Sequence, residues 1–201
     1  MTKWLSGYLP SVATAFALTV MPALADTYAP DFKQKGPEWK RGTGTTIEVK
    51  DGIMTETAPT TSDGLALNSV LQVTDCKIEA SGKLIDAPST DNAYWGIEFC
   101  STSPKDCYIF HVSNVGSYQI CRSVGGKFSY PLPWTAGAAA KKGDWNDLKV
   151  VVSGKRADFF INNQKVRSLP IEPPAGGGLF GLIVGTDVKA KGQFKNLKVT
   201  Y

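Results

Sequence analysis

The chain has 201 residues, of which 42% are hydrophobic, and its formal net charge at pH 7 is +4. A length in this range suits one domain with a sizeable core. The lysines and arginines are scattered along the chain, whereas a surface that follows phosphates needs a concentrated basic stripe. The sequence therefore predicts no nucleic-acid partner.

The first 25 residues have the organisation of a secretory signal. Lys3 gives one early positive charge, residues 11–24 are uncharged and largely apolar, and Ala23-Leu24-Ala25 supplies the small residues of a cleavage site. The alternative is a membrane anchor, but two prolines interrupt the stretch. We expect residues 1–25 to be removed and residues 26–201 to form one periplasmic or secreted domain without a further membrane span.

Short segments with alternating polar and apolar side chains, or rich in β-forming residues, recur through the rest of the chain between Gly, Pro, Asn and Asp. No segment has the pattern of an amphipathic helix, and only residues 138–142 would allow a helical turn. So many strands with short connections predict an all-β sandwich. The predicted strands are residues 45–49, 66–73, 76–85, 94–100, 107–113, 117–122, 147–152, 157–161, 179–186 and 193–201.

Two adjacent hairpins can be aligned from the sequence. Pairing Cys100 with Cys107 across a turn-rich hexapeptide fixes the first, and a turn at Asn114-Val115-Gly116 fixes the second. The register sets Tyr94 opposite Ser113, Gly96 opposite His111, Glu98 opposite Ile109, and Gln119 opposite His111. One face is then apolar and is expected to face the core, with Trp95, Ile97, Phe99, Tyr108, Phe110, Val112, Tyr118 and Ile120.

The opposite face of these hairpins is polar with one aromatic side chain, Tyr94. It carries Glu98, Gln119 and the single histidine of the chain, His111. Such a face is either ordinary solvated sheet or a binding surface, and the sequence leaves both interpretations open. Gly96 lies in it, and a strand glycine outside a turn often marks the close approach of a ligand or of another backbone.

Four cysteines occur in a chain whose expected compartment permits disulfides. Their spacings match no zinc-binding pattern, and one histidine does not complete one, so we expect no metal site. The hairpin register predicts a disulfide between Cys100 and Cys107. The remaining pair would be Cys76 with Cys121.

Four segments near the C-terminus form the most specific pattern of the sequence: residues 143–150 (GDWNDLKV), 159–166 (FFINNQKV), 176–184 (GGGLFGLIV) and 193–199 (QFKNLKV). The series resembles the concanavalin A-like lectin and glucanase superfamily, and within it the laminin G-like domains and the bacterial exported family named for 3-keto-disaccharide hydrolases. This resemblance implies a jelly-roll sandwich of two curved antiparallel sheets, whose concave side binds saccharides in many relatives.

The elements of this pattern have structural roles. Trp145 is expected to start a strand and bury its indole, Asn162-Asn163 to form a tight turn, and Gly181 to let two strands approach closely. The resemblance therefore indicates a fold rather than an active site.

Catalysis is not predicted, because the usual acids are missing. Glucanases of the superfamily carry alternating acids on one strand, and Glu98 is the only acid in its strand. The 3-keto-disaccharide family usually has a Gln and a His where this chain has Ile183-Val184-Gly185. The alternative is a glycan-processing hydrolase or lyase with Glu98 and His111 as general acid and base. The same two residues would equally suit a hydrogen-bonded surface pair.

Aromatic side chains give the better case for binding a sugar, because a pyranose face packs on an aromatic ring while polar groups take its hydroxyls. Between Tyr130 and Trp134 two prolines predict an extended, stiff loop. Trp39 is a further candidate, and the alternative for Trp134 is that it only covers the edge of the core. The predicted ligand-binding residues are Tyr94, Glu98, His111, Gln119, Tyr130 and Trp134.

We therefore predict an exported carbohydrate-binding or ligand-binding module without catalysis of its own and without a cofactor. Laminin G-like relatives often hold calcium, and Asp91, Asn92 and Asp187 are loop residues with suitable oxygens, but no motif brings them together. A third alternative is a structural or protein-interaction domain of the cell envelope.

Overall fold

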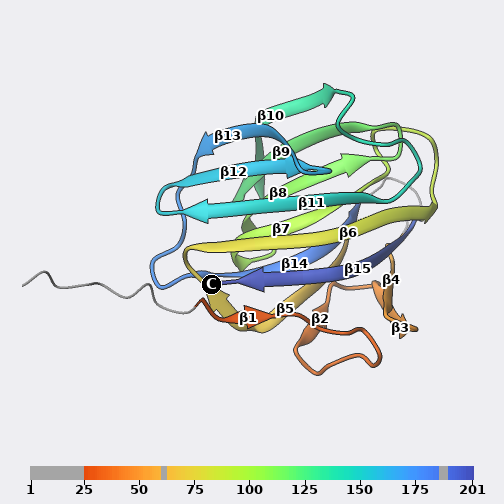
Figure 1. The fold of residues 1–201 in the computed structure, drawn as a ribbon, viewed down its shortest axis with the longest axis horizontal. Coiled ribbons are helices and arrows are strands. Elements are labelled where there is room, and N and C mark those ends of the chain that lie inside the picture. The colour runs from red at the N-terminus through yellow and green to blue at the C-terminus, as the bar shows by residue number, and fades with distance from the viewer. Residues whose placement is uncertain (1–24, 60–62, 186–189) are drawn as a thin grey trace, which may run out of the picture.

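The computed structural model describes residues 25–59, 63–185 and 190–201. Within these ranges the regular elements are strands, arranged in two antiparallel sheets that pack face to face (Figure 1). The predicted all-β sandwich is therefore confirmed. The predicted signal, apart from Ala25, lies outside the described residues. In the described part of the chain no helix is long and apolar enough to cross a membrane.

One sheet has eight strands and the other has seven, and in Figure 1 the eight-stranded sheet lies in front. The eight-stranded sheet has the order β13 (Gln164–Pro170), β12 (Arg156–Ile161), β11 (Asn146–Ser153), β6 (Cys76–Asp86), β15 (Lys191–Thr200), β4 (Ile53–Thr57) and β3 (Thr46–Lys50), with β1 (Thr27–Tyr28) also paired to β15. The seven-stranded sheet has the order β10 (Lys127–Ala136), β9 (Ser117–Val124), β8 (Asp106–Ser113), β7 (Tyr94–Ser103), β14 (Gly178–Gly185), β5 (Gly64–Val73) and β2 (Trp39–Arg41).

Every predicted strand coincides with an observed one, although the ends differ by a few residues. The structure adds β1, β2, β4, β10 and β13, which the sequence analysis missed. The first two are only two and three residues long, and β10 contains two prolines, which argue against a strand when it is read from the sequence alone. Residues 138–142 form turns and no helix.

The core fills the space between the sheets with aromatic and aliphatic side chains. Trp95 on β7 packs against Phe194 on β15, with ring centroids 5.7 Å apart, and Phe110 on β8 packs against Phe159 on β12 at 5.2 Å. The second hairpin has the predicted register, and the first has it from Tyr94 to Phe99 but not at the predicted Cys100–Cys107 pair, because the pairing of β7 with β8 shifts after Phe99. The side chains predicted to face the core do so, with Tyr118 partly buried.

Two predicted local features are also confirmed. Asn162 and Asn163 have φ angles of +48° and +65° and form the two-residue turn between β12 and β13. Gly181 on β14 lies so close to β5 that a Cβ there would come within 2.9 Å of the carbonyl oxygen of Ala66.

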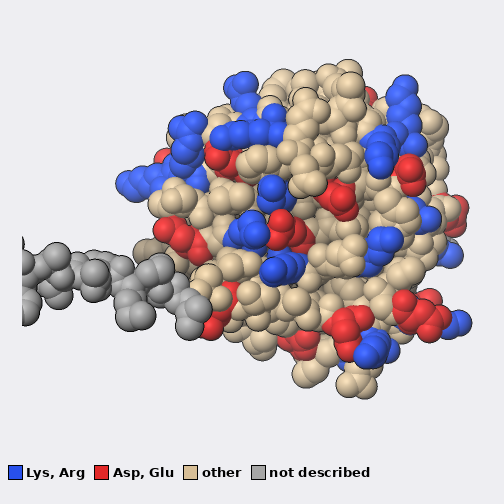
Figure 2. Space-filling model, in the orientation of Figure 1, with Lys and Arg blue, Asp and Glu red and all other residues tan. Residues whose placement is uncertain are grey.

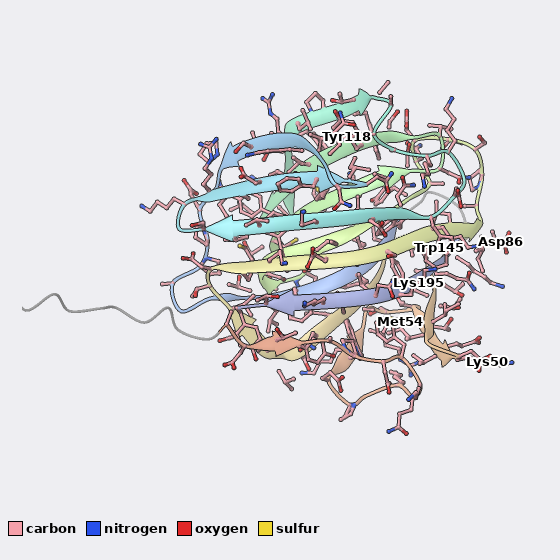
Figure 3. The ribbon with its side chains drawn as sticks, in the orientation of Figure 1. Lys50, Met54, Asp86, Tyr118, Trp145 and Lys195 are labelled. Atoms are coloured by element: carbon pink, nitrogen blue, oxygen red, sulfur yellow. The ribbon has the colours of Figure 1, made fainter. Side chains whose placement is uncertain are left out.

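Trp145 departs from its predicted role. Its indole is only partly buried and precedes the first residue of β11. The ammonium groups of Lys195 and Lys83 lie over the ring at 4.2 Å and 5.1 Å from its centroid, and Figure 3 shows Trp145 beside Lys195. The side chain therefore belongs to the outer face of the eight-stranded sheet, where cation–π contacts hold it, and not to the core.

The outer face of the eight-stranded sheet carries interspersed basic and acidic side chains (Figure 2). Lys77 pairs with Glu79 at 3.1 Å, and Lys165 pairs with Asp158 at 2.7 Å. Exposed ion pairs of this kind contribute little to stability. A face covered with such mixed charges is typical of a sheet surface in contact with solvent.

The structure does not contain the predicted disulfides, and all four cysteines are free. The pairing of β7 with β8 is irregular after Phe99, and Cys100 has a φ angle of +50°. Cys100 consequently packs against the core between the sheets, and Cys76 on β6 lies in the same core. The other two cysteines belong to an apolar group on the outer face of the seven-stranded sheet, the outer cluster, which consists of Leu65, Leu67, Cys107, Ile109, Cys121 and Ile183. Each predicted pair thus has one cysteine in the core between the sheets and the other on the outer face of the seven-stranded sheet.

Candidate functional site

The outer face of the seven-stranded sheet contains a cavity of about 430 Å³, which we call the first cavity. Side chains from β7, β8, β9 and β10 line it. The lining includes five of the six predicted ligand-binding residues, namely Tyr94, His111, Gln119, Tyr130 and Trp134. The register of the hairpins brings the first three together, because they stand on one face of neighbouring strands.

A second cavity of about 500 Å³ lies beside the first and shares Asp63, Ile109 and Phe128 with it. Glu98, the sixth predicted residue, lines this second cavity. We refer to the two together as the groove. Both volumes fall in the range of pockets that hold small ligands.

Three rings pack together in the first cavity, and one pair of them is stacked. The ring centroid of His111 lies 4.3 Å from that of Tyr94 and 4.9 Å from that of Trp134. The planes of the His111 and Trp134 rings are nearly parallel, with an angle of 18° between them. Two glycines make room for this arrangement: a Cβ at Gly185 would overlap the Tyr94 ring, and a Cβ at Gly96 would overlap His111. The close approach that Gly96 permits is therefore that of the neighbouring strand β8, and not that of a ligand.

His111 is a buried and neutral side chain. Its Nε2 donates a hydrogen bond of 2.9 Å to Oε1 of Gln119, which leaves Nδ1 as an unprotonated nitrogen. Burial lowers the pKa of His111 to about 4, although the contact with Gln119 raises it in part. The histidine partner is thus Gln119 on β9, and the structure does not form the hydrogen-bonded Glu98–His111 pair that the sequence left open.

Glu98 is buried at the second cavity, with 2% of its surface exposed. Its Oε1 has no hydrogen-bond partner in the described residues. Burial raises the pKa of Glu98 to about 7; the Ser101 hydroxyl lowers it in part, and the carboxylate of Asp63 raises it further. A carboxyl group with this pKa changes charge close to neutral pH, as general acids and bases do.

The segment between Tyr130 and Trp134 forms part of an edge strand, β10, and not the predicted loop. Register shifts on both sides of Leu132 accommodate the two prolines, which an edge strand tolerates because one side of it needs no hydrogen bonds. Phe128 and Tyr130 are 53% and 54% exposed, and Trp134 is half-buried. The strand therefore forms an aromatic wall along the groove.

Asp63 and Asn92 also line the first cavity, and sequence reasoning did not select Asp63. The Tyr94 hydroxyl donates a hydrogen bond of 2.9 Å to Oδ1 of Asp63. No local sequence pattern identifies Asp63 as a site residue. It directly precedes β5, and it reaches Tyr94 on β7 only because β14 lies between these two strands in the sheet. Trp39, by contrast, is buried in the core beside Phe32 and is not part of the groove.

Of the three residues considered for calcium, the structure describes Asp91 and Asn92. Asp91 accepts a hydrogen bond of 2.8 Å from the Ser113 hydroxyl, Asn92 lines the first cavity, and Asp187 lies outside the described residues. In the ranges that the structure describes, no group of three or more His, Cys, Asp or Glu side chains is arranged to hold a metal ion.

Residues 28–200 match the profile of a protein family described as the 3-keto-alpha-glucoside-1,2-lyase-like domain. The chain belongs to this family. A comparison with curated proteins gave no match.

Several solved structures share the fold at low sequence identity. The carbohydrate binding module CBM66 from Bacillus subtilis has a TM-score of 0.65 at 16% identity, over 80% of this chain and 94% of that one. The carbohydrate recognition domain of Emp47p has a TM-score of 0.63 at 10% identity, over 90% and 98%. A Bacillus licheniformis beta-glucanase has a TM-score of 0.61 at 7% identity, over 90% and 99%. These likenesses confirm the predicted concanavalin A-like jelly roll.

Proposed function

We propose that this protein binds a saccharide in the groove of its seven-stranded sheet. The observation that carries the proposal is the first cavity, in which an aromatic wall faces amide and carboxylate side chains. Trp134 and Tyr130 present ring surface of the kind on which a pyranose packs, and Gln119 and Asp63 offer groups for its hydroxyls. Membership of a family described by a keto-glucoside lyase, and the likeness to carbohydrate-binding domains, support the same proposal.

The test is a titration of the protein, without residues 1–25, with methyl glycosides of glucose, galactose and mannose in both anomeric forms. We expect Trp134→Ala to weaken binding about tenfold or more, because stacking on an aromatic ring is typically worth about 1 to 3 kcal/mol, by analogy with stacked bases. Calorimetry measures the affinity, and a thermal melt checks the fold.

Trp145→Ala is the matched control, since it removes a half-buried tryptophan from the opposite sheet. It should leave affinity unchanged. Unchanged affinity in both Trp134→Ala and Tyr130→Ala would place the saccharide elsewhere, and absence of binding to every glycoside would reject the proposal.

A second candidate is a lyase that cleaves 3-keto-glucosides, favoured by the family and by the buried Glu98. A ketone at C3 acidifies the proton at C2. The Glu98 carboxylate would take that proton, the C2–H electron pair would form a C1=C2 double bond, and the C1–O bond would break as the leaving oxygen takes a proton from solvent. Such a base works best with a pKa near the working pH.

The lyase candidate predicts release of the aglycone and of an unsaturated sugar from a 3-keto-glucoside. Because the base must be ionised, the rate should rise with pH through about 7. Glu98→Gln should abolish release and keep binding, whereas a wild-type protein that binds the substrate and releases nothing would leave only the binding function.

The signal pattern of residues 1–25 supports a further part of the proposal, namely that the protein acts in the periplasm or outside the cell. Mass spectrometry of the protein from a cell fraction tests this: the expected N-terminus is Asp26.

A further inference from the structure

The second cavity differs in chemistry from the first. Its apolar side is formed by Leu65, Ile109 and Ile183 of the outer cluster together with Pro104 and Phe128, and the polar side chains of its lining are Arg41, Thr43, Asp63 and Glu98. Saccharides have hydroxyls on most carbons, and the apolar side of this cavity offers no hydrogen-bonding side chain for them. An apolar group would fill it with more surface removed from water.

The outer cluster is unusual in its position. The outer face of a sheet in a two-layer sandwich is ordinarily polar, because only the inner face meets the other sheet. Here apolar side chains on β5, β14, β8 and β9 gather on the outer face, apart from the core. The sequence predicts a polar face on β7, β8 and β9, which is observed at His111 and Gln119, whereas Ile109 and Cys121 belong to the outer cluster.

Two further observations indicate a place for a ligand. Glu98 lies among the residues that line the second cavity, is 2% exposed, and has an Oε1 without a partner in the described part of the chain. Phe128 is a large side chain that stays 53% exposed at the boundary between the two cavities. The exposed Phe128 ring leaves apolar surface in water, which an apolar group bound beside it would cover. The buried Glu98 oxygen needs a hydrogen-bond donor, which the sugar hydroxyls of a glycoside can supply and an apolar group cannot.

We propose that the ligand of the groove is a glycoside with an apolar aglycone, whose sugar occupies the first cavity and whose aryl or alkyl group occupies the second. This inference rests on the proposed saccharide binding and adds the class of ligand. Phe128, shared by both cavities, packs against the aglycone next to the glycosidic bond. The outer cluster forms the floor beneath the aglycone.

The test compares methyl and phenyl glycosides of the same sugar and anomer, using the panel that tests the proposed function. We expect the phenyl glycoside to bind about tenfold or more tightly than the methyl glycoside, because a buried phenyl ring removes much more apolar surface from water. Phe128→Ala should reduce this preference several-fold and change affinity for the methyl glycoside less.

Val124→Ala is the matched control, because Val124 is 52% exposed on the same hairpin and does not line the groove. It should leave the preference unchanged. Ile183→Thr provides a second variant that touches only the second cavity, and it should reduce the preference while a thermal melt confirms that the variant folds.

The outcomes separate the two proposals. Equal binding of methyl and phenyl glycosides would overturn the aglycone inference and leave saccharide binding intact. A preference that survives both Phe128→Ala and Ile183→Thr would also overturn it, because the apolar group would then lie elsewhere. If neither class of glycoside binds, the proposed function fails and the inference fails with it.

Discussion

At the scale of single residues, the most unusual side chain outside the groove is Glu56. It lies fully buried on β4. Burial raises the pKa of its carboxyl well above the usual range; the backbone amide of Val184 lowers it in part, and the charges of Asp63 and Glu98 raise it further. The folded protein therefore holds Glu56 protonated at pH values where the unfolded chain ionises it.

This difference makes stability depend on pH. Below pH 4.5, the usual pKa of a glutamate, Glu56 is protonated in both the folded and the unfolded chain and does not affect stability. Above that pH only the unfolded chain ionises Glu56, so the contribution of this residue lowers the stability of the fold as pH rises. Glu56→Gln stays neutral, so we expect its stability relative to the wild type to be greater at pH 8 than at pH 4. Thermal melts at pH 4 and pH 8 measure the difference.

Glu48→Gln is the control, because Glu48 is an exposed acid on the neighbouring strand β3. It should not change the pH dependence. The same stability of Glu56→Gln relative to the wild type at pH 4 and pH 8 would contradict a raised pKa of Glu56 in the folded state.

At the scale of elements, the groove depends on how closely β7, β8 and β14 approach one another. Gly185 on β14 stands directly opposite Tyr94 on β7, and the Tyr94 ring covers the space where a Cβ would be. Gly185→Ala should therefore displace Tyr94, lower stability by about 1 to 3 kcal/mol, and weaken glycoside binding. Denaturant unfolding and calorimetry give the two values.

A double-mutant cycle isolates the cause. In a Tyr94→Ala background the alanine at position 185 has room, so its effect on stability should largely disappear. An equal loss in both backgrounds would mean that the glycine is needed for another reason.

Strand β10 is an element that the sequence did not predict. Tyr130 and Trp134 line the first cavity beside the hairpin face, as their predicted place near that face requires. Their setting differs from the prediction, because the two prolines predict a loop and the segment belongs to β10. An edge strand needs hydrogen bonds on one side only, and β10 uses register shifts to place its prolines.

At the scale of the whole molecule, the two faces of the seven-stranded sheet have different roles. The inner face of the seven-stranded sheet packs against the eight-stranded sheet, and its outer face bears the groove. The irregularity after Phe99 in β7 moves Cys100 to the inner side, while Cys107 stays outside. One irregularity in a strand is enough to separate residues that a strict alternation would place together.

The sequence by itself determined the sandwich, the register of the β7–β8–β9 hairpins and most of the first cavity. These depend on contacts between neighbouring segments, and the alternation of side chains along a strand is written in the sequence. Only the tertiary structure decided the second cavity, the partner of Tyr94 and the faces of the four cysteines. Asp63, Glu98 and Ile183 meet because β14 lies between β5 and β7, and no local pattern in the chain encodes that long-range order of strands.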